Sequence, residues 1–293
     1  MEISLIYGGT TTSLTDGTIG RLLRFDGTGE APLHRLEERG PQQHGSTDIG
    51  FRLDPRIIDM VLWLNASSLS ALEDKRKLLA DAFRATTVTK TLRFTLDNGE
   101  VYDINGHSAG TMLLPMESGG GFTIRAGVQF RASDPTFYDA SGHAVTFELG
   151  GGGSAFEVPT DVPSQVGASE IDQATALTYA GTWRAYPQIR ITGPITDAVV
   201  ENETTDEKLD FTDTTIAAGN WYDIDLRYGY KTVTNSSDTS TISALSSDSD
   251  LATWHLADDS EVTDGVNSIS VSGSAVTGAT KVEITYFDRF VGI

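Results

Sequence analysis

The chain has 293 residues, with 21 basic and 41 acidic side chains, a formal net charge of −20 and no cysteine. This length favours two domains of ordinary size. The absence of thiols excludes disulfides, thiolate zinc sites and cysteine nucleophiles. No stretch approaches the roughly 20 apolar residues of a membrane span, and the first residues lack the pattern of a secretory signal, so neither membrane insertion nor export is expected.

The negative charge is concentrated in the second half of the chain. Residues 1–154 carry 14 basic and 19 acidic side chains, a net charge of −5, whereas residues 155–293 carry 7 and 22, a net charge of −15. Neutralisation of phosphates by basic side chains supplies most of the affinity of proteins for nucleic acids. We therefore expect no sequence-specific binding of nucleic acid.

A run of glycines marks the predicted domain boundary. Residues 150–154, Gly-Gly-Gly-Gly-Ser, are flexible by composition, and the chain stays small and polar up to about residue 181. We predict a first domain at 1–149, a linker at 150–181 and a second domain at 182–293.

One helix is expected, at about residues 67–86. Leu72, Leu79 and Phe83 recur at helical spacing. Ser70 and Glu73 have the spacing of a capping box, although a start one turn earlier, near Ser67, is also compatible with the pattern.

Two apolar segments of the first domain predict strands. Residues 57–64 are apolar on both faces, and such a strand must be covered on both sides. The second cover could be the helix or a neighbouring subunit. Residues 122–131 alternate over an unusual length. We infer that these strands shield identical copies from water, and we predict as oligomer-interface residues Ile58, Met60, Leu62, Leu64, Phe122, Ile124, Val128 and Phe130.

The second domain is expected to contain strands only. Alternation at 222–228 and 282–286, and apolar residues at 266–271 followed by a predicted turn at Ser272 and Gly273, indicate a β-sandwich. The predicted fold is therefore mainly β with one helix: a β-rich first domain and a β-sandwich.

The sequence makes no case for an enzyme. Ser108 lies in a G-x-S-x-G pattern, but the residues that follow it cannot form the helix that a nucleophile elbow requires. Asp223 and Asp225 alternate with apolar residues, which puts them on the outer face of a strand, where polar residues are expected without any metal. We predict no catalytic residue, no cofactor and no metal site.

Trp183, Trp221 and Trp254 support an alternative function, a carbohydrate-binding module in the second domain, because sugar rings stack on exposed aromatic side chains. Each tryptophan borders a predicted strand or lies between apolar residues, as a packing residue would. We therefore expect all three to be packing residues.

Several stretches in order resemble the distal tail protein family of long-tailed, non-contractile phages: Pro41–Gly45, Phe130–Asp139, Trp183–Pro194 and Val282–Tyr286. The linker at 150–181 and extended loops at 24–50 and 234–250 depart from the family pattern. The resemblance implies a belt domain that closes into a homo-hexameric ring, single or stacked as a pair, and a galectin-like sandwich outside it. It further implies a structural hub at the distal end of the virion tail, made in the host cytoplasm, with the tail tube protein, the tail-tip or baseplate hub protein and the tape measure protein as partners.

Overall fold

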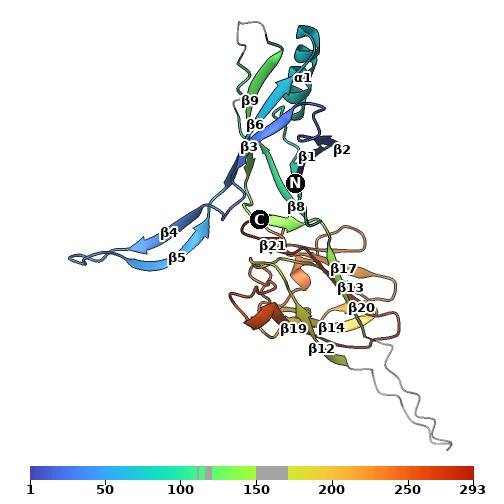
Figure 1. Cartoon of the computed structure of the whole chain (residues 1–293). Coiled ribbons are helices and arrows are strands. Elements are labelled where there is room, and N and C mark those ends of the chain that lie inside the picture. The colour runs from blue at the N-terminus through green and yellow to red at the C-terminus, as the bar shows by residue number, and fades with distance from the viewer. Residues whose placement is uncertain (111, 116–120, 150–170) are drawn as a thin grey trace, which may run out of the picture. The chain divides into compact units, whose positions relative to one another are not determined.

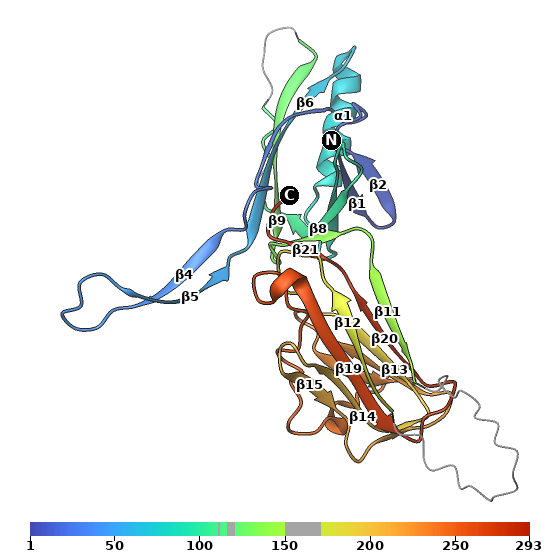
Figure 2. The same cartoon turned by 60° about the horizontal axis from the view of Figure 1, so that its bottom comes forward.

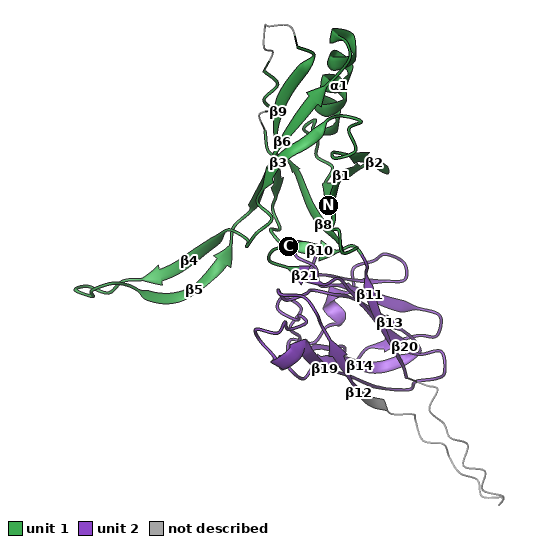
Figure 3. Cartoon of the chain, in the orientation of Figure 1, with its two compact units in different colours: residues 1–140, 290–293 green, residues 141–289 purple. Residues whose placement is uncertain are grey.

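The computed structural model describes the whole chain except residues 111, 116–120 and 150–170. The chain divides into two compact units (Figure 3), of which unit 1 comprises Met1–Ala140 and Phe290–Ile293 and unit 2 comprises Ser141–Arg289. Strands dominate both units, so the fold is mainly β, as predicted. Among the described residues, no helix has the length and apolar character needed to cross a membrane.

The two units do not coincide with the predicted ranges of 1–149, 150–181 and 182–293. Strands β11 (His143–Glu148) and β12 (Ile171–Thr178) pair within the sheets of unit 2, although the prediction assigned them to the first domain and the linker. Residues 150–170 of that linker lie outside the described part of the chain. The last four residues belong to unit 1, where the Ile293 amide donates to the Thr28 carbonyl at 3.0 Å.

Unit 1 is built on one large antiparallel sheet (Figure 1). Its strands follow one another across the sheet in the order β2 (Thr10–Ser13), β1 (Glu2–Tyr7), β7 (Lys90–Thr95), β8 (Val101–Ser108), β9 (Thr123–Ala132), β6 (Arg56–Asn65) and β3 (Arg21–Asp26), with β10 (Phe137–Asp139) pairing to β8. The last strand of the chain is β21 (Arg289–Phe290).

The strands predicted at 57–64 and 122–131 are confirmed as β6 and β9, which pair along ten positions. Their register sets Ile58 opposite Phe130 and Leu64 opposite Ile124. Because side chains alternate along a strand, the even-numbered residues of both strands share one face. That face forms the core of unit 1.

Helix α1 (Leu69–Ala82) confirms the predicted helix, with shorter bounds than 67–86. Ser68 is the N-cap, and its hydroxyl accepts from the Ala71 amide at 3.2 Å, so the capping box predicted at Ser70 is wrong by two residues. At the other end, the Lys90 ammonium donates to the carbonyls of Ala82 (2.6 Å) and Arg84 (2.7 Å). A buried cation from β7 thus satisfies carbonyls that the end of a helix leaves without partners.

Residues 33–53 form a hairpin that we call the arm, made of β4 (Leu33–Glu38) and β5 (Thr47–Leu53). It projects from the rest of unit 1 (Figures 1 and 2). The prediction of an extended loop at 24–50 is therefore wrong. The alternation that reveals a strand comes from having one face buried. Every residue of β4 is exposed, so that signal is missing from the sequence.

Arg56, at the start of β6, holds the base of the arm. Its guanidinium is buried and donates to four carbonyl oxygens, those of Gly27 (2.6 Å), Gly29 (2.7 Å), Pro135 (2.7 Å) and Val291 (2.5 Å). Burial lowers the pKa of Arg56. One side chain therefore ties together the segment leading into the arm, the segment before β10 and the end of the chain.

Unit 2 is a β-sandwich, as predicted (Figure 2). One sheet has the order β11, β20 (Lys281–Tyr286), β13 (Gln188–Thr192), β17 (Trp221–Asp225) and β18 (Thr232–Asn235). The other has the order β12, β19 (Val266–Ser274), β14 (Ile195–Asn202) and β15 (Glu207–Asp210), with β16 (Thr215–Ile216) pairing to β14. Two short 3-10 helices, η1 (Ile242–Ala244) and η2 (Thr263–Gly265), lie in its connections.

The turn predicted at Ser272 and Gly273 is wrong, because β19 continues through both residues to Ser274. A Cβ atom on Gly273 would lie 2.7 Å from the side chain of Ile195. This glycine therefore marks close packing between neighbouring strands and not a change of direction.

Candidate interaction surfaces

Seven of the eight predicted interface residues are buried within a single chain. Ile58, Met60, Leu62 and Leu64 of β6, and Ile124, Val128 and Phe130 of β9, are at most 6% exposed and belong to the core of unit 1. Phe122, just before β9, is 44% exposed. The first seven have no surface to offer a second copy, so their assignment as interface residues is corrected to core residues.

The opposite face of β6, which we call the outer face, is the one left open. Ile57 is 46% exposed, and Val61 and Trp63 are partly exposed. The helix does not supply the second cover, because its buried Leu72 and Leu79 join the core on the side of the even-numbered residues. Of the two covers that the sequence left open for this strand, the helix is therefore ruled out.

Arginines border the apolar residues of the outer face. Across the sheet, Trp63 lies between Arg21 of β3 and Arg125 of β9, and Ile57 pairs with Arg131. At a β-bulge in β3, Leu23 is 51% exposed. The same face also carries Asp59, which accepts from Gln129 at 2.7 Å and lies opposite Asp26, so the outer face combines apolar side chains with charges of both signs.

The arm is a second surface with exposed apolar side chains. Leu33, Leu36, Ile49 and Phe51 are between 41% and 62% exposed. Its charged residues pair with one another, as Arg35 does with Asp48 at 2.7 Å. A two-stranded hairpin has little stability of its own in water. An arm with four large apolar residues in solvent is therefore suited to lie against another protein surface.

Ser108 does not form a nucleophile elbow. It is the last residue of β8 and pairs with Phe130 of β9, and the described residues that follow, 109–110 and 112–115, contain no helix. The Lys90 ammonium lies 3.5 Å from its hydroxyl but donates to the carbonyls at the end of α1. Burial, and to a lesser degree the charge of Arg84, lowers the pKa of Lys90.

The outward face of the β11–β18 sheet in unit 2 carries a row of charged pairs. Arg190 of β13 binds Asp223 of β17 through two hydrogen bonds, of 2.6 and 2.9 Å. Asp225 accepts from Gln188 at 3.2 Å and from Arg227 at 2.6 Å. Asp223 and Asp225, which the sequence predicts on the outward side of a strand, are therefore both bound by guanidinium groups.

The ionisation of these pairs follows from their contacts. The hydrogen bond to Asp223 raises the pKa of Arg190. Burial acts to raise the pKa of Asp225, but its hydrogen bonds from Arg227 outweigh that effect and lower it. Arg190 and Asp225 are thus both charged at neutral pH.

The three tryptophans of unit 2 differ in burial. Trp254 is fully buried in the core, which confirms its predicted packing role. Trp183 and Trp221 are partly exposed. The Trp221 indole donates to Asp223 at 3.1 Å, and the Arg190 guanidinium lies 5.2 Å from its ring centre. Full burial is therefore seen for Trp254, whereas Trp183 and Trp221 are buried only in part.

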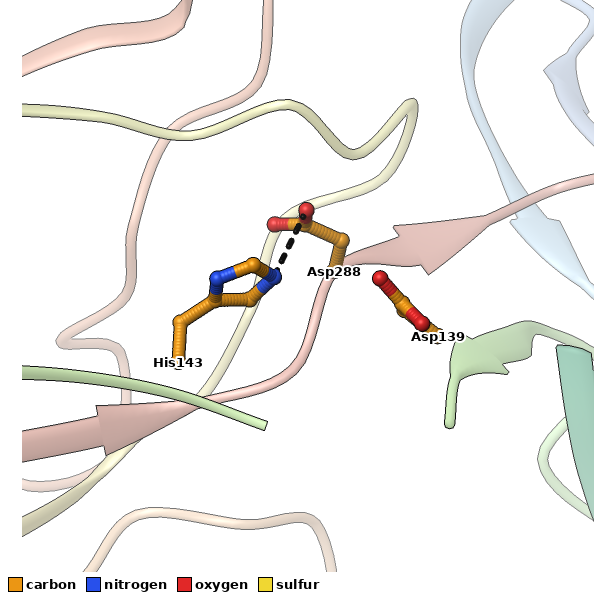
Figure 4. A group of neighbouring side chains, drawn as sticks. All are labelled: Asp139, His143 and Asp288. Atoms are coloured by element: carbon orange, nitrogen blue, oxygen red, sulfur yellow. Dashed lines mark ion pairs between the residues drawn. The ribbon is translucent and has the colours of Figure 1, made fainter. Parts of the chain in front are cut away.

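An ion pair stands at one end of the same sheet. His143, at the start of β11, lies 3.2 Å from Asp288, which follows β20 (Figure 4). The ring of His143 also stacks on that of Tyr286. Asp139, drawn in the same view, is a residue of unit 1. The pair closes the end of the sheet where β11 meets β20.

Residues 12–124 match the family described as the phage tail protein RIFT-related domain. The match begins in β2 and ends in β9, and it includes the arm, the outer face of β6 and helix α1. The whole chain is similar in structure to the distal tail protein of phage SPP1, with a TM-score of 0.67, 12% sequence identity, and coverage of 98% of this chain and 99% of that one. The chain carries a phage tail domain and has the distal tail protein fold.

The resemblance to the distal tail family noted in the sequence is thus confirmed by domain and fold. The SPP1 protein is described as a paradigm of the hub adsorption apparatus in phages that infect Gram-positive bacteria. Chains of the phage p2 baseplate in its activated conformation, with calcium and with strontium, match at TM-scores of 0.47 each, with 9% and 10% identity and 97% coverage on both sides. No curated protein sequence is similar to this chain.

Proposed function

We propose that this distal tail protein is a structural hub of the phage tail tip, whose copies close into a ring through unit 1. The observation that carries the proposal is the pair of open surfaces on that unit, the outer face and the arm. In a head-to-tail interface, two different patches of one chain meet, and such an interface yields a ring if the rotation between copies closes. Unit 1 offers two different patches of this kind.

The arm of one copy lies on the outer face of the next. The exposed side chains of Ile49 and Phe51 then meet those of Ile57 and Leu23, and the contact removes apolar surface of both partners from water. The arginines around the outer face remain at the rim, where charged residues tolerate partial hydration. This arrangement provides the second cover that β6 lacks within its own chain.

The ring has six copies and joins the tail tube protein to the tail-tip protein at the distal end of the virion. The hexamer and these partners are what the family resemblance implies, and the hub described for the SPP1 protein supports a hub role for this chain. Unit 2 is the galectin-like domain on the outside of the ring. Its role in this proposal is structural, with no catalytic step.

Size-exclusion chromatography with light scattering tests the ring. Six chains of 31.4 kDa give about 188 kDa, and a stacked pair of rings gives twice that mass. We expect Phe51→Asp on the arm and Ile57→Asp on the outer face each to reduce the mass to that of the single chain. The control is Tyr228→Asp, which changes a 78% exposed residue of unit 2 and leaves the ring intact.

A wild-type chain that runs as a strict monomer at micromolar concentration would contradict the proposal. A ring that survives both substitutions would refute the assignment of these two surfaces, even if the ring itself exists.

A further inference from the structure

The outward face of the sheet containing β13 and β17 is hollowed. A depression of about 420 Å³ lies over the middle strands of the sheet. Its volume is within the ~300–1,000 Å³ typical of clefts that take small molecules. All of its lining belongs to unit 2, and the outward-pointing residues around it are Gln188, Arg190, Asp223, Asp225, Thr232, Thr234, Glu283 and Thr285.

The strand register arranges these side chains in two rows across the sheet. One row runs Thr285, Gln188, Asp225 and Thr232, and the next runs Glu283, Arg190, Asp223 and Thr234. An outward face needs only polar residues to stay soluble. The fixed pairing of donors of β13 with acceptors of β17, over a depression, goes beyond that requirement.

The groups in the depression are held in place before any ligand arrives. Arg190 is fixed by its two bonds to Asp223, and Asp225 is fixed by Gln188 and Arg227. A carboxylate has about four acceptor positions and a guanidinium five donors, so each keeps capacity for further hydrogen bonds. A ligand that binds here meets oriented donors and acceptors and need not order them.

The charge of the lining selects the class of ligand. Each of the three carboxylates has a cationic partner, Arg190 for Asp223, Arg227 for Asp225 and Lys281, at 2.8 Å, for Glu283. The lining therefore has no excess of cations to bind a phosphate- or carboxylate-bearing ligand. Hydroxyl groups both donate and accept, which matches this mixed surface. A neutral compound with many hydroxyls is therefore the ligand that fits.

Trp221 adds an apolar surface beside the depression. It precedes Asp223 on the same outward side of β17, and it is partly exposed while its indole nitrogen donates to Asp223 at 3.1 Å. An indole fixed in this way offers a flat surface at the edge of a polar site, as the C–H face of a sugar ring requires. We propose that this depression binds a neutral saccharide, an activity separate from ring formation.

A glycan array probed with the fluorescently labelled full-length chain tests the proposal. The array carries neutral oligosaccharides of glucose, galactose, rhamnose and N-acetylglucosamine beside anionic glycans. We expect the wild type to bind neutral members, and Trp221→Ala and Asp223→Asn each to weaken that binding at least tenfold.

Two further variants separate binding from folding. Thr232→Arg places a long side chain in the depression without altering the Arg190–Asp223 pair, and it should abolish binding with an unchanged melting temperature. Asp103→Asn is the matched control, because Asp103 binds Arg93 in unit 1 with the same two-bond geometry, at 2.7 Å for each bond. It should leave binding unchanged.

No binding to any neutral glycan, binding only to anionic glycans, or an equal loss in Asp103→Asn and Asp223→Asn would overturn the proposal. Each of these results leaves the mass of the assembly unchanged, so the failure of this inference and the failure of the ring are distinguishable.

Discussion

Replacing Arg56 with methionine tests how the base of the arm is held. Methionine keeps most of the apolar stem but removes the guanidinium that donates to the carbonyls of Gly27, Gly29, Pro135 and Val291. A buried acceptor left without a donor costs roughly 1–3 kcal/mol. Three of the four bonds are only part-buried, so water can replace some of the lost donors.

We therefore expect Arg56→Met to lower the free energy of unfolding of unit 1 by about 3–5 kcal/mol, less than the sum of four separate losses. For a unit of this size, 1 kcal/mol corresponds to a shift of roughly 2–4 °C in melting temperature, so the transition should fall by about 10 °C. Differential scanning calorimetry on the full chain measures this shift. The transition of unit 2 should not move.

The matched control is Arg93→Met, which removes a half-exposed cross-strand pair and should cost less than about 1 kcal/mol. Arg56→Lys keeps the charge but offers fewer donors with another geometry, and it should fall between the wild type and the methionine variant. A change below about 1 kcal/mol in Arg56→Met would refute the inference that this guanidinium holds the three segments together.

Two further substitutions test buried polar groups. Lys90→Met removes the donor from the carbonyls of Ala82 and Arg84 and should destabilise unit 1 by about 2–3 kcal/mol in urea denaturation. Tyr179→Phe removes a buried hydroxyl that donates to the Trp183 carbonyl (2.6 Å) and accepts from the Arg289 amide (2.8 Å), at a cost to unit 2 of about 1–2 kcal/mol. Burial raises the pKa of Tyr179 above its ordinary value of 10.0, so the unfolded chain loses this proton first and the stability of the wild type should fall as pH rises above about 10. Tyr179→Phe should lack that part of the pH dependence.

Unchanged stability in Lys90→Met would mean that α1 ends without help from β7. If wild type and Tyr179→Phe lose stability in parallel above pH 10, the folded state does not hold this hydroxyl in its neutral form.

Alternation and spacing predict where the helix and strands of this protein lie better than they predict which side of each strand meets the core. The strands at β6 and β9, the helix and the sandwich follow from periodicity, because each has one buried face. Residues 57–64 are apolar on both faces, so periodicity alone cannot say which face meets the core. The structure buries the side of Ile58 and leaves the side of Ile57 open, so the predicted interface residues of β6 are core residues.

Other features depend on contacts between distant parts of the sequence. The Arg190–Asp223 pair joins residues 33 positions apart and requires the register of β13 with β17. The return of the last four residues to unit 1 rests on contacts such as that of Val291 with Arg56, 235 positions apart. The glycine run at 150 suggested a boundary by composition, but β11, which precedes it, pairs with β20 of unit 2.

Disulfide cross-linking between copies tests the central claim, that the arm of one chain lies on the outer face of the next. The chain has no cysteine, so Ile49→Cys on the arm and Ile57→Cys on the outer face introduce single thiols. Mixed and oxidised, the two variants should give a linked pair of twice the chain mass, in much higher yield than either variant alone. No excess of the mixed pair, under conditions in which the wild type forms its ring, would contradict the claim.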